Sequence, residues 1–148
     1  MADLANATKF YINGEWVEPL SQDRLDVVNP ATEQAINQIA MGNVQDADRA
    51  VQAAAKAFES FSQTSKQERI ELLERIIASY KKFMPSIAEA VSDEMGAPTG
   101  LANEAQAQSG LGHMMTRLAV LRDFDFEEVL GSTSIVRKAP GLCGFITP

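Results

Sequence analysis

The sequence predicts an α+β fold with β-hairpins at the N-terminus, four to five helices in the middle and a β-hairpin at the C-terminus. Three observations indicate this class. Asn13-Gly14 lies between aromatic and β-branched residues, the apolar period changes from two residues to 3.6 after Gly42, and β-branched residues return after Ser132. The 148 residues, 45% of them hydrophobic, suffice for a globular domain with a core.

The first 42 residues are predicted to form a small antiparallel β cap. Residues 10–17 form a hairpin around Asn13-Gly14, because both central residues of a type I′ turn need a positive φ. Short strands follow at 25–28 and 34–41, and Asn29-Pro30 ends the first of them.

Capping residues place the helices. Asn43, with Asp46 three residues on, can cap a first helix, and Ser65 with Glu68 forms the capping box of a second. Pro85 either kinks the second helix or begins a new one as a first-turn residue.

A last long helix is expected after Gly96 and Pro98, which end the preceding one. Thr99 is the candidate cap of this helix. Gly110 and Gly112 lie inside it, at a cost of about 1 kcal/mol each in helix propensity. That cost indicates a close backbone contact.

The C-terminal stretch contains two β segments, 133–138 and 142–147, separated by Pro140-Gly141. The second is almost wholly apolar, which is typical of a strand buried on both faces. Such a strand needs neighbours, and parallel crossover units take roughly 30 residues or more. We therefore expect the front part of a longer protein, or a chain that borrows its missing layer from a partner.

Charge and composition exclude several classes of function. The net charge is −7 and the pI about 4.7, with scattered Lys and Arg, which disfavours nucleic acid and anionic membrane surfaces as partners. The sequence shows no signal peptide and no apolar run long enough to span a membrane. A single Cys fits a reducing compartment, so the cytoplasm is the expected location.

No catalytic constellation is visible. Cys143 has no adjacent charge to activate it and is predicted to be a buried strand residue. His113 is the only His, and no partner lies at the fixed spacing that a metal site needs, so we interpret it as a helix-surface or interface residue. Gly110 and Gly112 begin like a dinucleotide fingerprint, but the third Gly and the preceding strand are missing.

Several stretches together resemble the N-terminal part of the aldehyde dehydrogenase superfamily, in its bacterial form. Phe61 and Ala97 are minor departures, where many members have Trp and Lys. The matching stretches are Ile12–Val17, Val28–Thr32, Asp46–Val51 leading to Ala57-Phe58, Arg69 with Leu72-Leu73, Glu94–Pro98 and Pro140–Pro148.

The resemblance implies a Rossmann-like α/β parent enzyme that oxidises an aldehyde to an acid with NAD or NADP. It implies that residues 1–127 belong to the cofactor-binding domain, and that 128–148 form a bridging hairpin and the first strand toward the cofactor. The family's catalytic Cys and Glu would lie beyond Pro148, so no catalytic residue is assigned. These 148 residues alone are expected to be inactive and to bind no cofactor.

The resemblance also implies site residues. Ile146, Thr147 and Pro148 match the strand end that borders the cofactor. Val28 and Glu94 match positions whose carbonyls hold a structural monovalent cation in some members. Residues 128–144 match the hairpin that joins subunits into homo-oligomers, dimers or tetramers.

Two alternatives remain open. The chain could be a non-catalytic interaction module that binds another chain through its C-terminal hairpin, or a small ligand-binding helical protein. Light scattering separates the first from a bare fragment, and a thermal shift with NAD, NADP and simple aldehydes tests the second.

Overall fold

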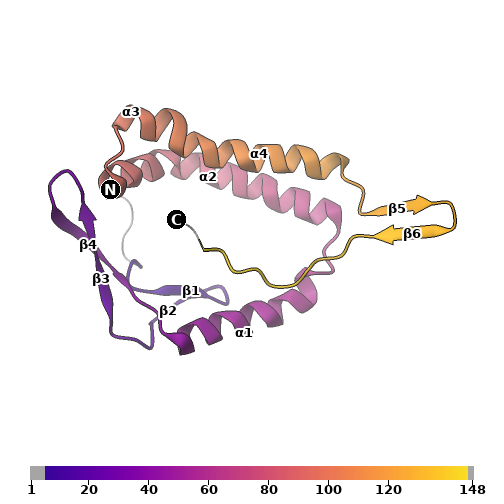
Figure 1. Ribbon diagram of the computed structural model, residues 1–148, viewed down its shortest axis with the longest axis horizontal. Helices are drawn as coiled ribbons and strands as arrows, with labels where there is room; N and C mark the ends of the chain where they lie inside the picture. Colours follow the sequence, from indigo (N-terminus) through magenta and orange to yellow (C-terminus); the bar gives the residue numbers. More distant parts are fainter. Residues whose placement is uncertain (1–5, 147–148) are drawn as a thin grey trace.

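The computed structural model describes residues 6–146. Three antiparallel hairpins flank a helical layer, and the hairpin near the C-terminus projects away from the helices (Figure 1). The strands are β1 (Phe10–Ile12), β2 (Glu15–Val17), β3 (Arg24–Asn29), β4 (Gln34–Ala40), β5 (Glu127–Leu130) and β6 (Thr133–Val136). The helical segments are α1 (Val44–Phe61), α2 (Lys66–Met95), α3 (Thr99–Leu101), the π-helical turn η1 (Ala102–Gln106) and α4 (Ala107–Asp123).

The N-terminal β cap is confirmed as two separate hairpins. In β1–β2, Asn13 and Gly14 have φ values of 54° and 82°, as a type I′ turn requires. Strands β3 and β4 form the second pair, with a register shift between Val27 and Val28. A shift of this kind disrupts the ladder locally and bends the strand.

Helix α1 begins at the predicted cap. The Asn43 side chain accepts from the Asp46 N–H at 3.0 Å, and the Asp46 carboxylate accepts from the Asn43 N–H at 3.2 Å. Asp46 also accepts from the Leu20 N–H at 2.9 Å and is only 3% exposed. One carboxylate therefore joins the helix start to the loop that follows β2.

This carboxylate predicts a pH-dependent stability. The Leu20 N–H is the main cause that lowers the pKa of Asp46, and the Asn43 N–H also lowers it, whereas burial opposes them. Because the folded pKa lies below the unfolded one, this stabilisation is present at neutral pH and is lost as pH falls through the folded pKa. We expect the urea concentration at the midpoint of unfolding to decrease when the pH is lowered below about 5. The decrease should be less steep in Asp46→Asn, because its side chain cannot ionise.

The control for this prediction is Asp48→Asn, an exposed position on the same helix. Its pH profile should follow that of the unsubstituted chain. Parallel profiles for Asp46→Asn and the unsubstituted chain would contradict the assignment.

Helix α2 is a single helix of 30 residues. Its capping box between Ser65 and Glu68 is confirmed, and it ends at Gly96 in the left-handed conformation with φ of 72°. Pro85 lies inside the helix, which continues through it. The described residues thus contain three long helices, α1, α2 and α4, fewer than the four to five expected.

The last helical stretch differs in detail from the prediction. Thr99 is the first residue of α3, and no side chain caps it, so the proposed cap at Thr99 was wrong. Gly110 does lie in close contact, because an added Cβ would meet the Tyr80 ring. Gly112 has open space around it, so the close contact predicted there was also wrong.

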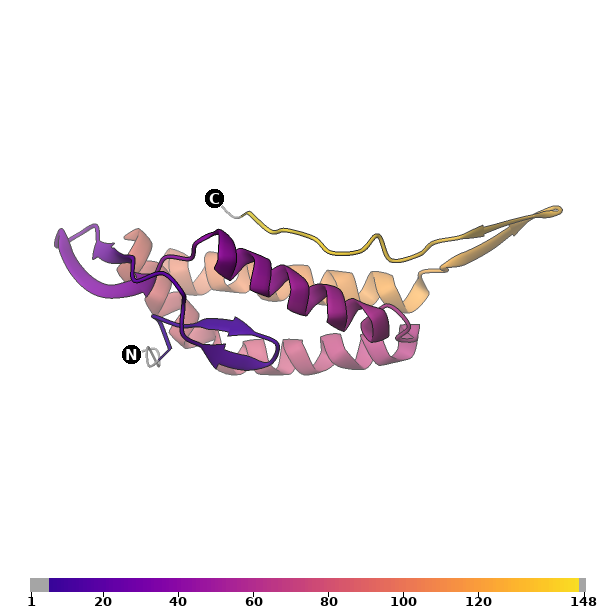
Figure 2. The same cartoon turned by 90° about the horizontal axis from the view of Figure 1, so that it is seen from below.

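The buried core lies between α2 and α4 (Figures 1 and 2). Ile70, Ile77 and Leu118 form one buried cluster, and three small alanines, Ala88, Ala102 and Ala107, form another. Helix α1 keeps large apolar side chains exposed, and Val51 is an example at 56%. Much apolar surface of the described chain is therefore left uncovered.

None of the helices between residues 6 and 146 combines the length and apolar character that crossing a membrane would need.

Candidate functional site

The C-terminal segment after β6 is extended and exposed. It returns from the root of the hairpin without pairing with any strand among residues 6–146 (Figure 2). Phe145 is 90% exposed and Ile146 99%. The predicted strand at 142–147, buried on both faces, is therefore not present at 142–146, because the described chain supplies no neighbour to pair with it.

The proposed cofactor-bordering residues lie at this end. Ile146 is described, whereas Thr147 and Pro148 lie outside the described residues.

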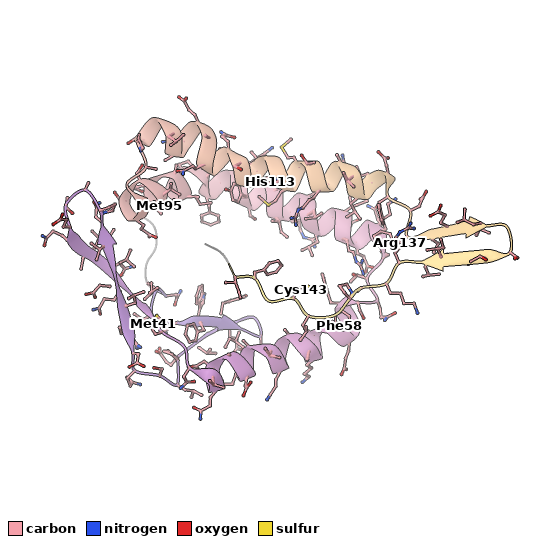
Figure 3. The ribbon with its side chains drawn as sticks, in the orientation of Figure 1. Met41, Phe58, Met95, His113, Arg137 and Cys143 are labelled. Atoms are coloured by element: carbon pink, nitrogen blue, oxygen red, sulfur yellow. The ribbon has the colours of Figure 1, made fainter. Side chains whose placement is uncertain are left out.

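Cys143 and His113 are both exposed (Figure 3). The prediction that Cys143 is a buried strand residue was wrong, because its segment forms no strand here. His113 lies on the surface of α4, as interpreted from the sequence. In the described part of the chain, no three His, Cys, Asp or Glu side chains group together to hold a metal ion.

The structure brings the neighbourhoods of Val28 and Glu94 together. A Cβ added at Gly96 would lie 2.7 Å from Pro30 Cγ, so the end of α2 touches the turn that follows β3. The helical partner of the Glu94 carbonyl would be residue 98, which is proline and has no N–H to donate. This carbonyl, at the negative end of the helix dipole, fits a cation ligand.

The C-terminal hairpin is confirmed, although with a different partner strand. β6 pairs with β5 through a two-residue turn at Gly131, whose φ is 62°, and not with residues 142–146; residue 147 of the predicted strand lies outside the described residues. Every residue of both strands is exposed, and Val129 is 72% exposed. Arg137 secures the root of the hairpin, since its N–H donates to Phe126 O at 2.8 Å and its guanidinium pairs with Glu128 at 3.1 Å.

A cavity of about 790 Å³ lies beside this root, where α1 ends and α2 begins. Four cations line it: Lys66, Arg69, Arg137 and Lys138. The sequence did not predict this cavity. Two of the cations are about 70 positions away from the other two, and no local pattern indicates that they meet.

Known structures share this arrangement of hairpins and helices. An aldehyde dehydrogenase from Bartonella henselae superposes with a TM-score of 0.82 and 39% identity, over 84% of this chain and 26% of that one. A mutant of aldehyde dehydrogenase C from Pseudomonas syringae, crystallised with NAD+ and octanal, superposes with a TM-score of 0.87 and 37% identity. This match covers 90% of this chain and 28% of that one.

These neighbours are dehydrogenases, and the sequence leads to the same class. The sequence model of the aldehyde dehydrogenase family matches residues 16–148, so the chain belongs to that family and the predicted kinship is confirmed.

Comparison with related sequences shows how much of each relative this chain covers. A 3-succinoylsemialdehyde-pyridine dehydrogenase from a Pseudomonas species is 47% identical over 141 residues, and a putative aldehyde dehydrogenase from Staphylococcus saprophyticus is 43% identical over 145. These regions are 95% and 98% of this chain, yet the chain spans only 30% of the length of either relative.

Proposed function

We propose that this chain is part of an NAD(P)-dependent aldehyde dehydrogenase, which oxidises an aldehyde to a carboxylic acid. The observation that carries the proposal is the family match over residues 16–148. The relative from Pseudomonas syringae, crystallised with NAD+ and octanal, supports both the cofactor and the substrate class. A single Cys in the chain supports a cytoplasmic location.

In this proposal the chain contributes the beginning of the cofactor site. Residues 1–127 form part of the cofactor-binding domain, and 128–148 form the bridging hairpin and the strand toward the cofactor. Ile146, Thr147 and Pro148 border the nicotinamide, and the family match, which extends over these three residues, supports this role.

A structural monovalent cation would be held by the backbone carbonyls of Val28 and Glu94. The contact between Gly96 and Pro30, and the missing helical donor at Pro98, support this assignment. Monovalent cations take oxygen ligands, and the carbonyl end of a helix favours positive charge.

The activity has a direct test. An antibody against this chain should recover, from the cells that make it, a polypeptide severalfold longer that reduces NAD+ or NADP+ with an aldehyde, followed at 340 nm. The purified 148-residue chain should show no turnover in the same assay. Recovery of a polypeptide that oxidises no aldehyde would contradict the proposed function, and turnover by the short chain would contradict its expected inactivity.

The partner proposed for residues 128–144 is a second copy of the chain. An unpaired strand edge invites association, and the exposed Val129 and Leu130 lie on such an edge. The same observation favours the alternative function, an interaction module that binds a different chain.

Light scattering after size exclusion tests this surface. We expect a dimer or larger species, and a shift toward monomer in Val129→Lys, because a charge cannot be buried unpaired at an interface. Val120→Lys, at an exposed position of α4, is the matched control and should keep the assembly. A monomeric unsubstituted chain that captures another protein would favour the module instead.

A further inference from the structure

The cavity at the hairpin root has an excess of positive charge. Its four cations face only two carboxylates in the lining, Asp125 and Glu127, whereas the whole chain carries a net charge of −7. Positive charge is therefore concentrated here against the trend of the molecule. A cluster of this kind attracts anions.

Most of these cations have no carboxylate partner. Among residues 6–146, Lys66, Arg69 and Lys138 form no ion pair, and only Arg137 has one, with Glu128. The half-buried Arg69 donates to neutral oxygens instead, Thr64 Oγ1 at 2.9 Å and Ser62 O at 3.3 Å.

The side chains keep donors for a ligand. Lys66 Nζ donates once, to Phe124 O at 2.9 Å, and an ammonium has three donors. Arg69 uses two of its five N–H groups. Lys138 makes no hydrogen bond among the described residues.

Aromatic rings hold the two guanidinium groups in place. Phe124 and Phe126 pack edge to face with centroids 4.9 Å apart. Arg69 lies 6.0 Å from the centre of the Phe126 ring, and Arg137 lies 5.7 Å from that of Phe124. These contacts restrict the guanidinium groups before any ligand arrives, which lowers the entropic cost of binding.

We propose that this cavity binds a small organic anion that carries a phosphate or two carboxylates. Guanidinium groups match the planar oxygen pairs of both groups, and ammonium groups add point charge. A volume near 790 Å³ suits a small organic molecule, with the phenylalanine rings against its apolar part. None of the cavity's lining residues belongs to the cofactor or cation residues proposed above, so this inference stands independently of them.

Isothermal titration calorimetry of the 148-residue chain tests the proposal, with phenyl phosphate, inorganic phosphate and succinate as probes. Tighter binding of phenyl phosphate than of inorganic phosphate would show that the rings contribute. A comparison of phenyl phosphate with succinate identifies which anionic group is preferred. Binding should weaken as salt is raised.

Lys138→Gln is the decisive variant, because Lys138 makes no hydrogen bond or ion pair among the described residues and lines the cavity. We expect its dissociation constant for the preferred probe to rise about fivefold, and that of Lys66→Gln/Lys138→Gln roughly 25-fold. Lys81→Gln removes the same charge from an exposed position outside the cavity and should change little. Circular dichroism of each variant is the control, and it should show the helix content of the unsubstituted chain.

Two results would overturn the proposal. One is the absence of binding by all three probes at low salt. The other is an equal effect of Lys138→Gln and Lys81→Gln, which would mean that the anions respond only to overall charge.

Discussion

Replacing Gly110 with alanine is expected to lower the free energy of unfolding by about 1–3 kcal/mol. The new methyl would collide with the Tyr80 hydroxyl and would lie 2.9 Å from Tyr80 Cζ. The ring cannot simply move away, because its hydroxyl donates to Ala107 O at 2.9 Å and so joins α2 to α4. Urea unfolding followed by circular dichroism measures the loss.

Gly112→Ala is the matched control, two residues further along the same helix. Nothing lies within 4 Å of its added Cβ, so only helix propensity changes and the free energy of unfolding should rise by about 0.5–1 kcal/mol. Removal of the hydroxyl in Gly110→Ala/Tyr80→Phe should recover part of the loss. Equal effects of the two alanines would contradict the proposed packing of α2 against α4.

Local rules predicted the parts of the fold that depend on neighbours in sequence. The Asn13-Gly14 turn, the Asn43 cap and the Ser65–Glu68 capping box follow from the backbone geometry of a few adjacent residues, and the structure has all three. The helix end at Gly96 belongs to the same group. The aldehyde dehydrogenase family was also predicted, since its stretches recur in order along most of the chain.

Features that depend on distant partners were predicted less well. An apolar run such as 142–146 becomes a strand only where another strand pairs with it, and the described chain offers none. Cys143 is exposed for that reason. The difference between Gly110 and Gly112 depends on where Tyr80 lies, and helix propensity is the same for both. The cationic cavity joins residues far apart in sequence, so no local pattern indicates it.

Gly96→Ala is expected to cost more, about 2–4 kcal/mol. Two costs combine at this position. Alanine is strained at a φ of 72°, and its Cβ would lie 2.7 Å from Pro30 Cγ. Gly131→Ala measures the backbone strain without a clash, because Gly131 has a φ of 62° and a Cβ added there would meet nothing within 4 Å. Its free energy of unfolding should fall by only about 1 kcal/mol. In the double variant Gly96→Ala/Pro30→Ala, the steric clash between the added Cβ and the Pro30 ring is relieved, whereas the backbone strain at a φ of 72° remains.

The same substitution tests the proposed cation site, because Gly96 and Pro30 meet where the segments that carry Val28 and Glu94 lie side by side. If those carbonyls bind a monovalent cation, the chain should unfold at a higher temperature in sodium or potassium chloride than in choline chloride of equal ionic strength. Gly131→Ala should keep this difference, whereas Gly96→Ala should abolish it. If Gly96→Ala keeps the difference in unfolding temperature between the salts, the cation effect arises elsewhere in the chain. If the unsubstituted chain shows no such difference, the assignment of a cation to the Val28 and Glu94 carbonyls is contradicted.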